Sequence, residues 1–216
     1  MICGVDEAGK GPVIGPLVVA AVMVKNLKII DDLGVKDSKI LSPNRRKELA
    51  KIIKEKFDYV VEIIDPKVID EYTFKKKLNQ LNREAFERVI SKLNPDIAYV
   101  DAADVNEHRF GILIKQGLTN SRDTDIISMH KADAKISVVA AASILAKETR
   151  ELEIKKLKDK IGDFGSGYPS DERTIKFLKA FYADKHKWPI GSRKSWKTLS
   201  RIKPVKTLYD FGENNE

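Results

Sequence analysis

The apolar residues of this chain first occur in short continuous runs. Residues 2–6 and 17–24 are apolar with little alternation, which is typical of strands that a sheet buries on both faces. Three further short runs predict strands at residues 59–64, 97–100 and 125–128. The pattern therefore predicts five strands.

Other segments repeat their apolar residues at helical spacing or carry residues that start a helix. Helices are expected at residues 45–56, 78–93, 138–160 and from 171 to about 183. Ser42 and Pro43 supply a cap and a first-turn proline for the first of these helices. Strands at the start, followed by alternating helices and strands, predict an α/β domain with a mixed central sheet flanked by helices.

Length and composition indicate a globular protein. With 216 residues, 42% of them hydrophobic and 33% charged, the chain can fold without a disulfide or a structural metal. Cys3 is the only cysteine, so an intrachain disulfide is excluded and a reducing compartment is expected. The longest apolar run, residues 13–24, is interrupted by Gly15 and Pro16 and is too short to cross a bilayer. We expect a cytoplasmic protein.

The net charge of +8 is concentrated in one segment. Residues 185–206 contain eight basic residues and no acidic residue, so the remainder of the chain is neutral. The basic residues are Lys185, Lys187, Arg193, Lys194, Lys197, Arg201, Lys203 and Lys206. Trp188 and Trp196 lie among them, and cations interleaved with flat rings are typical of a surface that binds nucleic acid. The alternative is a solvated charged face that the two tryptophans attach to the core.

Four carboxylates stand where predicted elements begin or end. Asp6 and Glu7 close the first strand. Asp101 follows the fourth strand, and Asp133 precedes the long helix. Ligands of open α/β sheets bind at the carboxyl ends of the strands, and clustered carboxylates repel one another unless a hard divalent cation lies between them. The residue types therefore predict Mg²⁺ or Mn²⁺, whereas one cysteine and three scattered histidines do not favour zinc.

Six ordered sequence blocks are more specific than any single motif. They lie at residues 6–12 (DEAGKGP), 35–42, 99–104 (YVDAAD), 130–135 (HKADAK), 140–147 and 162–171 (GDFGSGYPSD). In order and spacing, from residue 2 to about residue 203, the chain resembles the ribonuclease HII family (type 2 ribonuclease H) of the archaeal type.

The resemblance implies a ribonuclease H-like fold. It also implies an endonuclease that cuts the RNA strand of RNA–DNA hybrids, or duplex DNA on the 5′ side of an embedded ribonucleotide. Such an enzyme uses two metal ions, Mg²⁺ or Mn²⁺, and leaves a 3′-hydroxyl and a 5′-phosphate. The family's catalytic and metal-binding acids correspond to Asp6, Glu7, Asp101 and Asp133.

The resemblance also assigns residues to the substrate. The family's glycine–basic–glycine motif, which contacts the ribose 2′-hydroxyl through backbone atoms, corresponds to Gly9, Lys10 and Gly11. Lysine stands here where the family more often has arginine. The tyrosine that senses the RNA–DNA junction corresponds to Tyr168.

Three other cations, Lys36, Arg46 and Lys147, are expected to contact phosphates, or else to be ordinary charges on a loop or a helix face. Two other functions stay open at this point. One is a nucleic-acid binding module without catalysis, and the other is a nuclease of related fold that acts on DNA. The carboxylates argue against the first, because acids repel phosphate unless a metal intervenes.

The last dozen residues are expected to form a tail. The catalytic domain with its basic helical C-terminal region is predicted to span residues 1–204, and a flexible tail to span 205–216. Leu208 and Phe211 resemble the core of the short peptides that dock DNA-processing enzymes onto a sliding clamp, although Val205 stands where such peptides usually have glutamine. Otherwise a monomer is expected.

Overall fold

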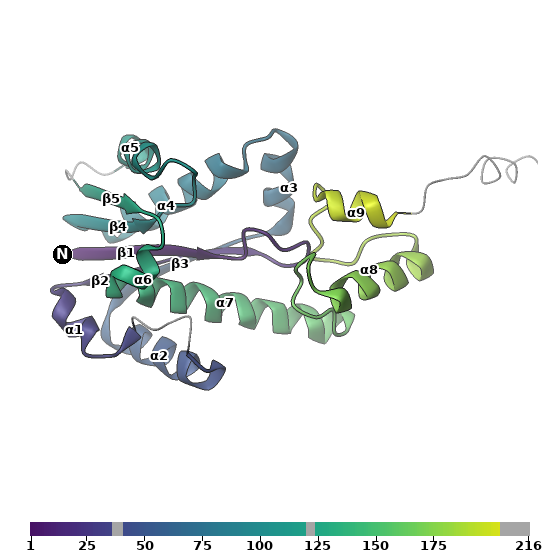
Figure 1. The fold of residues 1–216 in the computed structure, drawn as a ribbon, viewed down its shortest axis with the longest axis horizontal. Coiled ribbons are helices and arrows are strands. Elements are labelled where there is room, and N and C mark those ends of the chain that lie inside the picture. The colour runs from purple at the N-terminus through teal and green to yellow at the C-terminus, as the bar shows by residue number, and fades with distance from the viewer. Residues whose placement is uncertain (36–40, 120–123, 204–216) are drawn as a thin grey trace, which may run out of the picture.

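The computed structural model describes residues 1–35, 41–119 and 124–203. These residues form a five-stranded mixed sheet with helices on both faces, which confirms the predicted α/β class (Figure 1). The strands are β1 (Ile2–Ala8), β2 (Leu17–Val24), β3 (Asp58–Ile64), β4 (Ile97–Asp101) and β5 (Asp125–Met129). The helices are α1 (Leu27–Asp31), α2 (Pro43–Lys56), α3 (Pro66–Phe74), α4 (Leu78–Leu93), α5 (Glu107–Gly117), α6 (Ala132–Lys135), α7 (Ser137–Ile161), α8 (Glu172–Lys185) and α9 (Lys197–Ile202).

The strands lie in the order β3-β2-β1-β4-β5, so β1 is central. It pairs antiparallel with β2 as far as Ala8, but its parallel pairing with β4 ends where Val5 meets Val100. The last three residues of β1 therefore continue past this pairing, and β4 itself ends one residue later, at Asp101. This geometry places Asp6 and Glu7 near Asp101, the last residue of β4, at the carboxyl ends of these two strands. These strand ends form the acidic edge of the sheet.

Helix α7 covers one face of the sheet at very short range. Gly4 of β1 has no space for a side chain, because an added Cβ would lie 2.3 Å from the carbonyl carbon of Val138. The small residues Ala140, Ala141 and Ala142 are fully buried in the same apolar cluster, which α1 and α2 complete. Small side chains on both elements thus bring α7 directly against β1.

Helix α4 covers the other face. Its apolar stripe, including Leu81, Phe86 and Val89, packs on Val5 of β1 and on Val19 of β2. Successive residues of β1 therefore face different helices.

A third apolar cluster lies beyond the sheet, at the end that carries α8 and α9 (Figure 1). Val13 and Ile14, from the loop between β1 and β2, pack there with Phe164, Leu178 and Leu199. The C-terminal region is thereby attached to a loop at the beginning of the chain.

The predicted strands and helices are all present, with shifts of at most two residues at their ends. The helices α3 and α5, and the short helices α1, α6 and α9, were not among the predicted elements. No helix within the described residues combines the length and apolar content that a membrane crossing requires. The predicted contacts of Lys36, Leu208 and Phe211 fall outside the described residues.

Candidate active site

Asp6 and Glu7 lie on opposite faces of β1, because the strand remains regular as far as Ala8. Asp6 is 5% exposed and faces α7 on the side of Ser143. Glu7 faces α4 on the side of Asn82. The two neighbouring acids thus reach the edge of the sheet from either side of the strand.

The end of β4 brings the third and fourth acids to the same edge. Asp101 accepts a hydrogen bond from the backbone N–H of Ala132 at 2.9 Å. That bond ties β4 to the first turn of α6, in which Asp133 is 5% exposed. All four predicted acids therefore belong to adjoining ends of β1, β4 and α6.

Burial and mutual repulsion weaken the acidity of Asp6 and Glu7. Burial raises the pKa of Asp6 well above its usual range, and the charges of Glu7 and Asp101 add to the rise. Burial also raises the pKa of Glu7 to about 7, where Lys10 opposes the rise and Asp101 contributes to it. The positive charge near Asp6 and Glu7 is therefore too small to offset the effects of burial and of the neighbouring acids on their pKa values.

The donor set fits a hard divalent cation. The ligands are carboxylate oxygens, and the buried Oε2 atom of Glu7 has no hydrogen-bond partner within the described residues. A cation at this edge would relieve the repulsion that raises both pKa values. Over the described ranges, however, no three acidic, histidine or cysteine side chains stand in a ready-made ligand cluster. The four acids lie near one another at the acidic edge, but their side chains are not already arranged around a single metal position.

The loop of Gly9, Lys10 and Gly11 follows β1 directly, and its two glycines differ. Gly9 has φ +89°, and an added Cβ would lie 2.6 Å from the carbonyl oxygen of Pro16 and 2.7 Å from the Arg150 side chain. Gly11 has open space, since its added Cβ would meet only a Tyr168 ring carbon at 3.9 Å. Gly9 is required by the fold, whereas Gly11 leaves the approach to Tyr168 clear.

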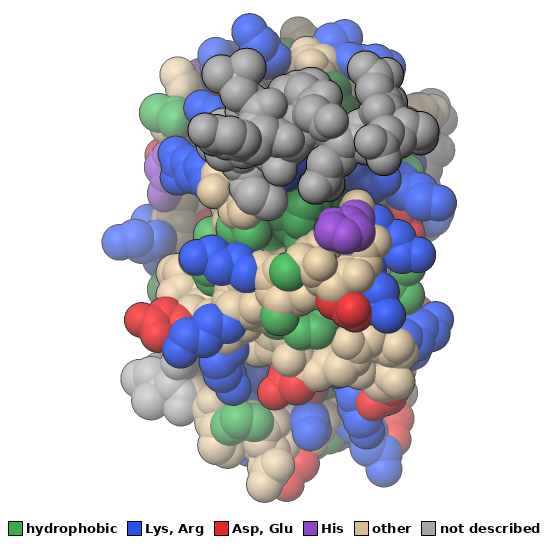
Figure 2. Space-filling model, turned by 90° about the vertical axis from the view of Figure 1, so that its right-hand side faces the viewer, with side chains coloured by type: hydrophobic (Ala, Val, Ile, Leu, Met, Phe, Trp, Pro, Cys, Tyr) green, Lys and Arg blue, Asp and Glu red, His purple; other side chains and the backbone are tan. Residues whose placement is uncertain are grey.

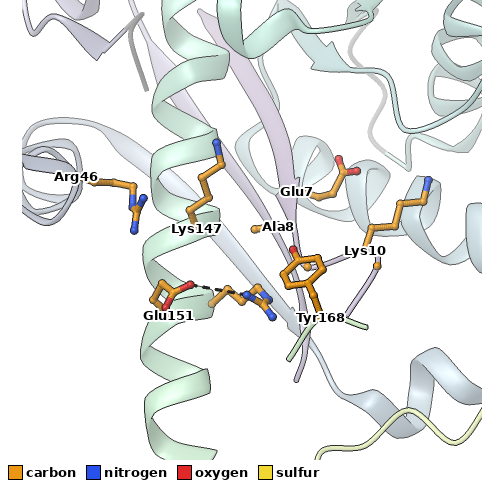
Figure 3. Close-up of a pocket in the computed structure, with 10 residues that line it drawn as sticks. Glu7, Ala8, Lys10, Arg46, Lys147, Glu151 and Tyr168 are labelled. Atoms are coloured by element: carbon orange, nitrogen blue, oxygen red, sulfur yellow. Dashed lines mark ion pairs between the residues drawn. The ribbon is translucent and has the colours of Figure 1, made fainter. Parts of the chain in front are cut away.

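Lys10 points toward the acids. Its ammonium donates to the carbonyl of Ala103, just after β4, at 2.5 Å, and lowers the pKa of Glu7. Figure 3 shows the side chains of Glu7 and Lys10 beside each other on the same side of β1. The cation of the glycine–basic–glycine motif thus links the loop to the acidic edge.

Tyr168 stands over a buried cation. The guanidinium carbon of Arg150, in α7, lies 5.1 Å from the centre of the Tyr168 ring. Arg150 is 5% exposed and also donates to the carbonyl of Ser166 at 3.3 Å, which fixes the loop that carries the tyrosine. Sequence reasoning did not identify Arg150.

A pocket of about 460 Å³ joins these features (Figure 3). It is lined by Glu7, Ala8, Gly9, Lys10, Gly11, Arg46, Lys147, Arg150, Glu151 and Tyr168. Seven of the predicted site residues line it, namely Glu7, Gly9, Lys10, Gly11, Arg46, Lys147 and Tyr168, whereas Asp6, Asp101 and Asp133 do not. Arg46 also forms an ion pair with the buried Glu148 at 2.5 Å, so this cation joins α2 to α7 as well.

The basic segment is divided between surface and core. Arg193 was expected among the cations that face phosphate, and this expectation is wrong because its side chain is fully buried. Lys194, Lys197, Arg201 and Lys203 are at least partly exposed, and Figure 2 shows Lys and Arg side chains around the face at this end of the molecule. Trp188 and Trp196 both pack on the third apolar cluster, so the tryptophans do attach the segment to the core.

The sheet order, the flanking helices and the acids at the end of the central strand define a protein of ribonuclease H-like fold. Comparison with known proteins narrows the class. The family model described as "Ribonuclease HII" matches residues 3–199, and the chain belongs to this family.

Its relatives match over nearly the whole chain. A ribonuclease HII from Thermococcus sibiricus is 50% identical over 204 residues, which cover 92% of this chain and 89% of the relative. The ribonuclease HII in the PCNA:RNase HII complex from Archaeoglobus fulgidus has a TM-score of 0.87 and 45% identity, and the match covers 98% of this chain and all of that chain. Bst-RNase HIII in complex with Mn²⁺ shares the fold, with a TM-score of 0.75 at 22% identity over 93% of this chain and 68% of that chain.

The chain is therefore an endonuclease of the ribonuclease H type, a phosphodiester hydrolase. It cleaves RNA in RNA–DNA hybrids and cleaves DNA at embedded ribonucleotides. Enzymes of this family use divalent metal ions.

Proposed function

We propose that Asp6, Glu7, Asp101 and Asp133 are the catalytic residues and hold Mg²⁺ or Mn²⁺. The observation that carries this proposal is the extension of β1 past its pairing with β4, close to Asp101 at the end of β4, whose charge acts on both Asp6 and Glu7. Divalent ions held by these carboxylates would activate a water and would stabilise the charge on the departing 3′-oxygen. The products would carry a 3′-hydroxyl and a 5′-phosphate.

The residues of this chain prepare the site for a negatively charged substrate. Lys147 and Arg46 line the pocket together with Glu7, where they would contact phosphates on either side of the cut. Lys10 holds the loop after β1 against the end of β4. Lys36 remains a proposed phosphate contact from the sequence alone.

The loop of Gly9, Lys10 and Gly11 together with Tyr168 would distinguish ribose from deoxyribose. A 2′-hydroxyl can donate and accept a hydrogen bond, so closely approaching backbone groups can recognise it. Gly11 leaves this approach open, and the Tyr168 ring, supported by Arg150 at 5.1 Å, offers a flat surface to the neighbouring sugar. Single ribonucleotides and RNA–DNA junctions would then be preferred sites.

A cleavage assay tests the assignment of the acids. Duplex DNA with one ribonucleotide, an RNA–DNA hybrid and an all-DNA duplex are incubated with Mg²⁺ or Mn²⁺. The wild-type protein should cut the first two only. Asp6→Asn and Asp101→Asn should each lower the rate by about a thousandfold or more, since the charge that holds the cations is reduced. Both variants should still bind the hybrid, because neutralising an acid does not weaken phosphate binding.

Asp104→Asn is the matched control, because Asp104 lies near the site but is paired with Arg109 at 2.7 Å. It should retain the wild-type rate. Wild-type rates in Asp6→Asn and Asp101→Asn at saturating metal would overturn the assignment.

We also propose that residues 1–204 form the catalytic domain and that residues 205–216 dock onto a sliding clamp through Leu208 and Phe211. The Archaeoglobus relative in its complex with PCNA supports a clamp as partner. Deleting residues 205–216 should abolish clamp binding measured by calorimetry and leave cleavage of short duplexes unchanged. Unchanged clamp binding would remove the tail from the proposal.

A further inference from the structure

The segment that leads into α9 makes direct hydrogen bonds to the loop after β1. The guanidinium of Arg193 donates to three backbone carbonyls, those of Gly15 at 3.0 Å, Lys10 at 2.8 Å and Gly9 at 2.5 Å. One side chain near the end of the chain therefore fixes the orientation of two successive peptide groups in the glycine–basic–glycine motif.

Trp196 continues this contact to the end of the motif. Its indole N–H donates to the carbonyl of Gly11 at 3.1 Å, and its ring lies 4.8 Å from the guanidinium carbon of Arg193. The backbone N–H of Arg193 also donates to the carbonyl of Val13 at 2.8 Å. Carbonyls of all three motif residues are thus held from one side by Arg193 and Trp196.

The segment is itself anchored from helix α3. Asp70, which is 8% exposed, accepts hydrogen bonds from the backbone N–H groups of Lys194 and Ser195, both at 2.8 Å. The Ser195 hydroxyl donates to the same carboxylate at 2.5 Å. Asp70 thereby fixes the residues between Arg193 and Trp196.

Burying the guanidinium of Arg193 is energetically costly. Arg193 is fully buried, and none of the ion pairs among the described residues includes it. Burial and the nearby charge of Arg150 lower its pKa to about 9. A buried cation without a paired acid destabilises a protein unless hydrogen bonds compensate for the lost water, and here backbone carbonyls of the motif supply them. Apolar packing alone would attach the segment with less cost, so the position of the charge calls for another role.

We propose that Arg193 is a positioning residue for substrate discrimination: it acts through Gly9 and Lys10 to hold the motif in the conformation that distinguishes ribose from deoxyribose. Trp196 and Asp70 support it. The inference rests on the proposed function of the Gly9–Lys10–Gly11 loop. Because only a planar guanidinium reaches three carbonyls at once, lysine cannot replace Arg193 at full effect.

The test measures binding in EDTA, where no cleavage occurs. Fluorescence anisotropy gives the Kd for a duplex with one ribonucleotide and for the all-DNA duplex of the same sequence. The readout is the ratio of the two Kd values, which cancels the non-specific attraction for phosphate. Arg193→Lys should reduce the ribose preference by about tenfold or more, the effect of losing a hydrogen bond to a charged group, with all-DNA binding unchanged.

Two further variants keep the test decisive. Trp196→Phe removes one hydrogen bond to Gly11 and should reduce the ratio less than Arg193→Lys, even if the latter folds poorly. Arg88→Lys is the matched control, since Arg88 is exposed on α4 and its guanidinium bonds to Glu62 away from the loop, and it should keep the wild-type ratio.

The outcomes separate the inference from the proposed function. A wild-type protein without ribose preference, or a Gly11→Ala variant that keeps the full preference, would refute the role of the loop and the inference with it. If Gly11→Ala loses the preference but Arg193→Lys and Trp196→Phe keep it and only melt earlier, the loop assignment stands. Arg193 is then purely structural, and the inference is wrong.

Discussion

Asn82 lies fully buried in α4 beside Glu7, and neither polar atom of its amide has a well-formed hydrogen bond within the described residues. An apolar residue of similar size would be less costly at this position, since leaving a buried polar group unsatisfied costs about 1–3 kcal/mol. The amide instead lies beside the Glu7 carboxylate and favours its ionised form, against the rise in pKa that burial causes.

Asn82→Leu is expected to stabilise the protein and to slow it. Removing the unsatisfied amide should raise the melting temperature by about 2–4 °C per kcal/mol gained. Cleavage should fall by about tenfold or more, because groups that orient a metal ligand typically have effects of that size. Calorimetry and a single-ribonucleotide assay measure the two effects. The control is Asn79→Leu, an exposed position one turn earlier in α4; equal effects there would show that Asn82 has no special relation to Glu7.

The pKa of Glu7 predicts a pH dependence of stability in the metal-free protein. Its value of about 7 in the folded state lies above the ordinary 4.5, so the folded protein binds a proton that the unfolded chain has released. Stability should therefore fall as pH rises from about 4.5 to 7, and stay low above that range.

Glu7→Gln removes this titration. In EDTA its melting temperature should exceed that of the wild type clearly at pH 8 and hardly at pH 4.5. Glu55→Gln, a change at an exposed glutamate of α2, should show no such pH-dependent gain. A Glu7→Gln gain that is the same at both pH values would contradict the raised pKa.

The two glycines of the loop should respond differently to alanine. Gly9→Ala places a Cβ 2.6 Å from a backbone carbonyl at positive φ and should destabilise the protein by about 1–3 kcal/mol or more. Gly11→Ala meets only an ordinary contact and should leave the stability within about 1 kcal/mol of the wild type. Its cleavage at a single ribonucleotide should nevertheless drop, because the methyl group narrows the approach to Tyr168. Full activity in Gly11→Ala would show that the substrate does not come close to this backbone.

Substitutions of Tyr168 should separate its hydroxyl from its ring. Tyr168→Phe retains the stacking on Arg150 and should lose about 0.5–1.5 kcal/mol of transition-state stabilisation, as for one hydrogen bond. Tyr168→Ala also loses the stacking surface, which is worth about 1–3 kcal/mol where a base stacks on a ring, and should cut less selectively at RNA–DNA junctions. Mapping the cleavage sites on end-labelled duplexes checks both. A Tyr168→Ala protein that melts earlier but cuts the same bonds at the wild-type rate would assign the ring a structural role only.

Salt dependence should identify the exposed cations that bind the backbone of the substrate. Replacing Lys194, Lys197 and Arg201 together with alanine should reduce the slope of log K against log salt by about 0.9 for each phosphate that these cations neutralise in the wild type. The control removes the same charge at the far end of the sheet, as Lys25→Ala, Lys28→Ala and Lys56→Ala, and should leave the slope nearly unchanged. Equal slopes in both triple variants would mean that the basic segment is only a solvated surface.

The sequence pattern predicted the elements whose apolar residues are either continuous or regularly spaced. β2 is buried along almost its whole length, and α4 has a regular apolar stripe, so a continuous run and a helical period sufficed. The missed helices α3 and α5 have start signals, Asp65 before Pro66 and the cap of Asn106, but they contain only 9 and 11 residues. A start signal alone does not predict a short helix, because such a helix is stable only when tertiary packing supports it.

The acids were found because each one ends an apolar strand or precedes a helix. Arg193 was misinterpreted because a charge in a basic run normally faces water. Its burial depends on carbonyls of Gly9, Lys10 and Gly15, which are far away in sequence and carry no side-chain signal. Backbone acceptors leave no trace in composition or periodicity, so only the folded chain reveals them.

The bond between Arg193 and Gly15 joins residues 178 positions apart, which has a consequence for synthesis of the protein. At roughly 5–20 residues per second, a ribosome needs about ten to thirty-five seconds to make the chain between them. Throughout that time the nascent chain already contains Gly9 and Lys10, but not the guanidinium that orients their carbonyls. A polypeptide released shortly before residue 193 would carry all four acids and still lack this final hydrogen bond.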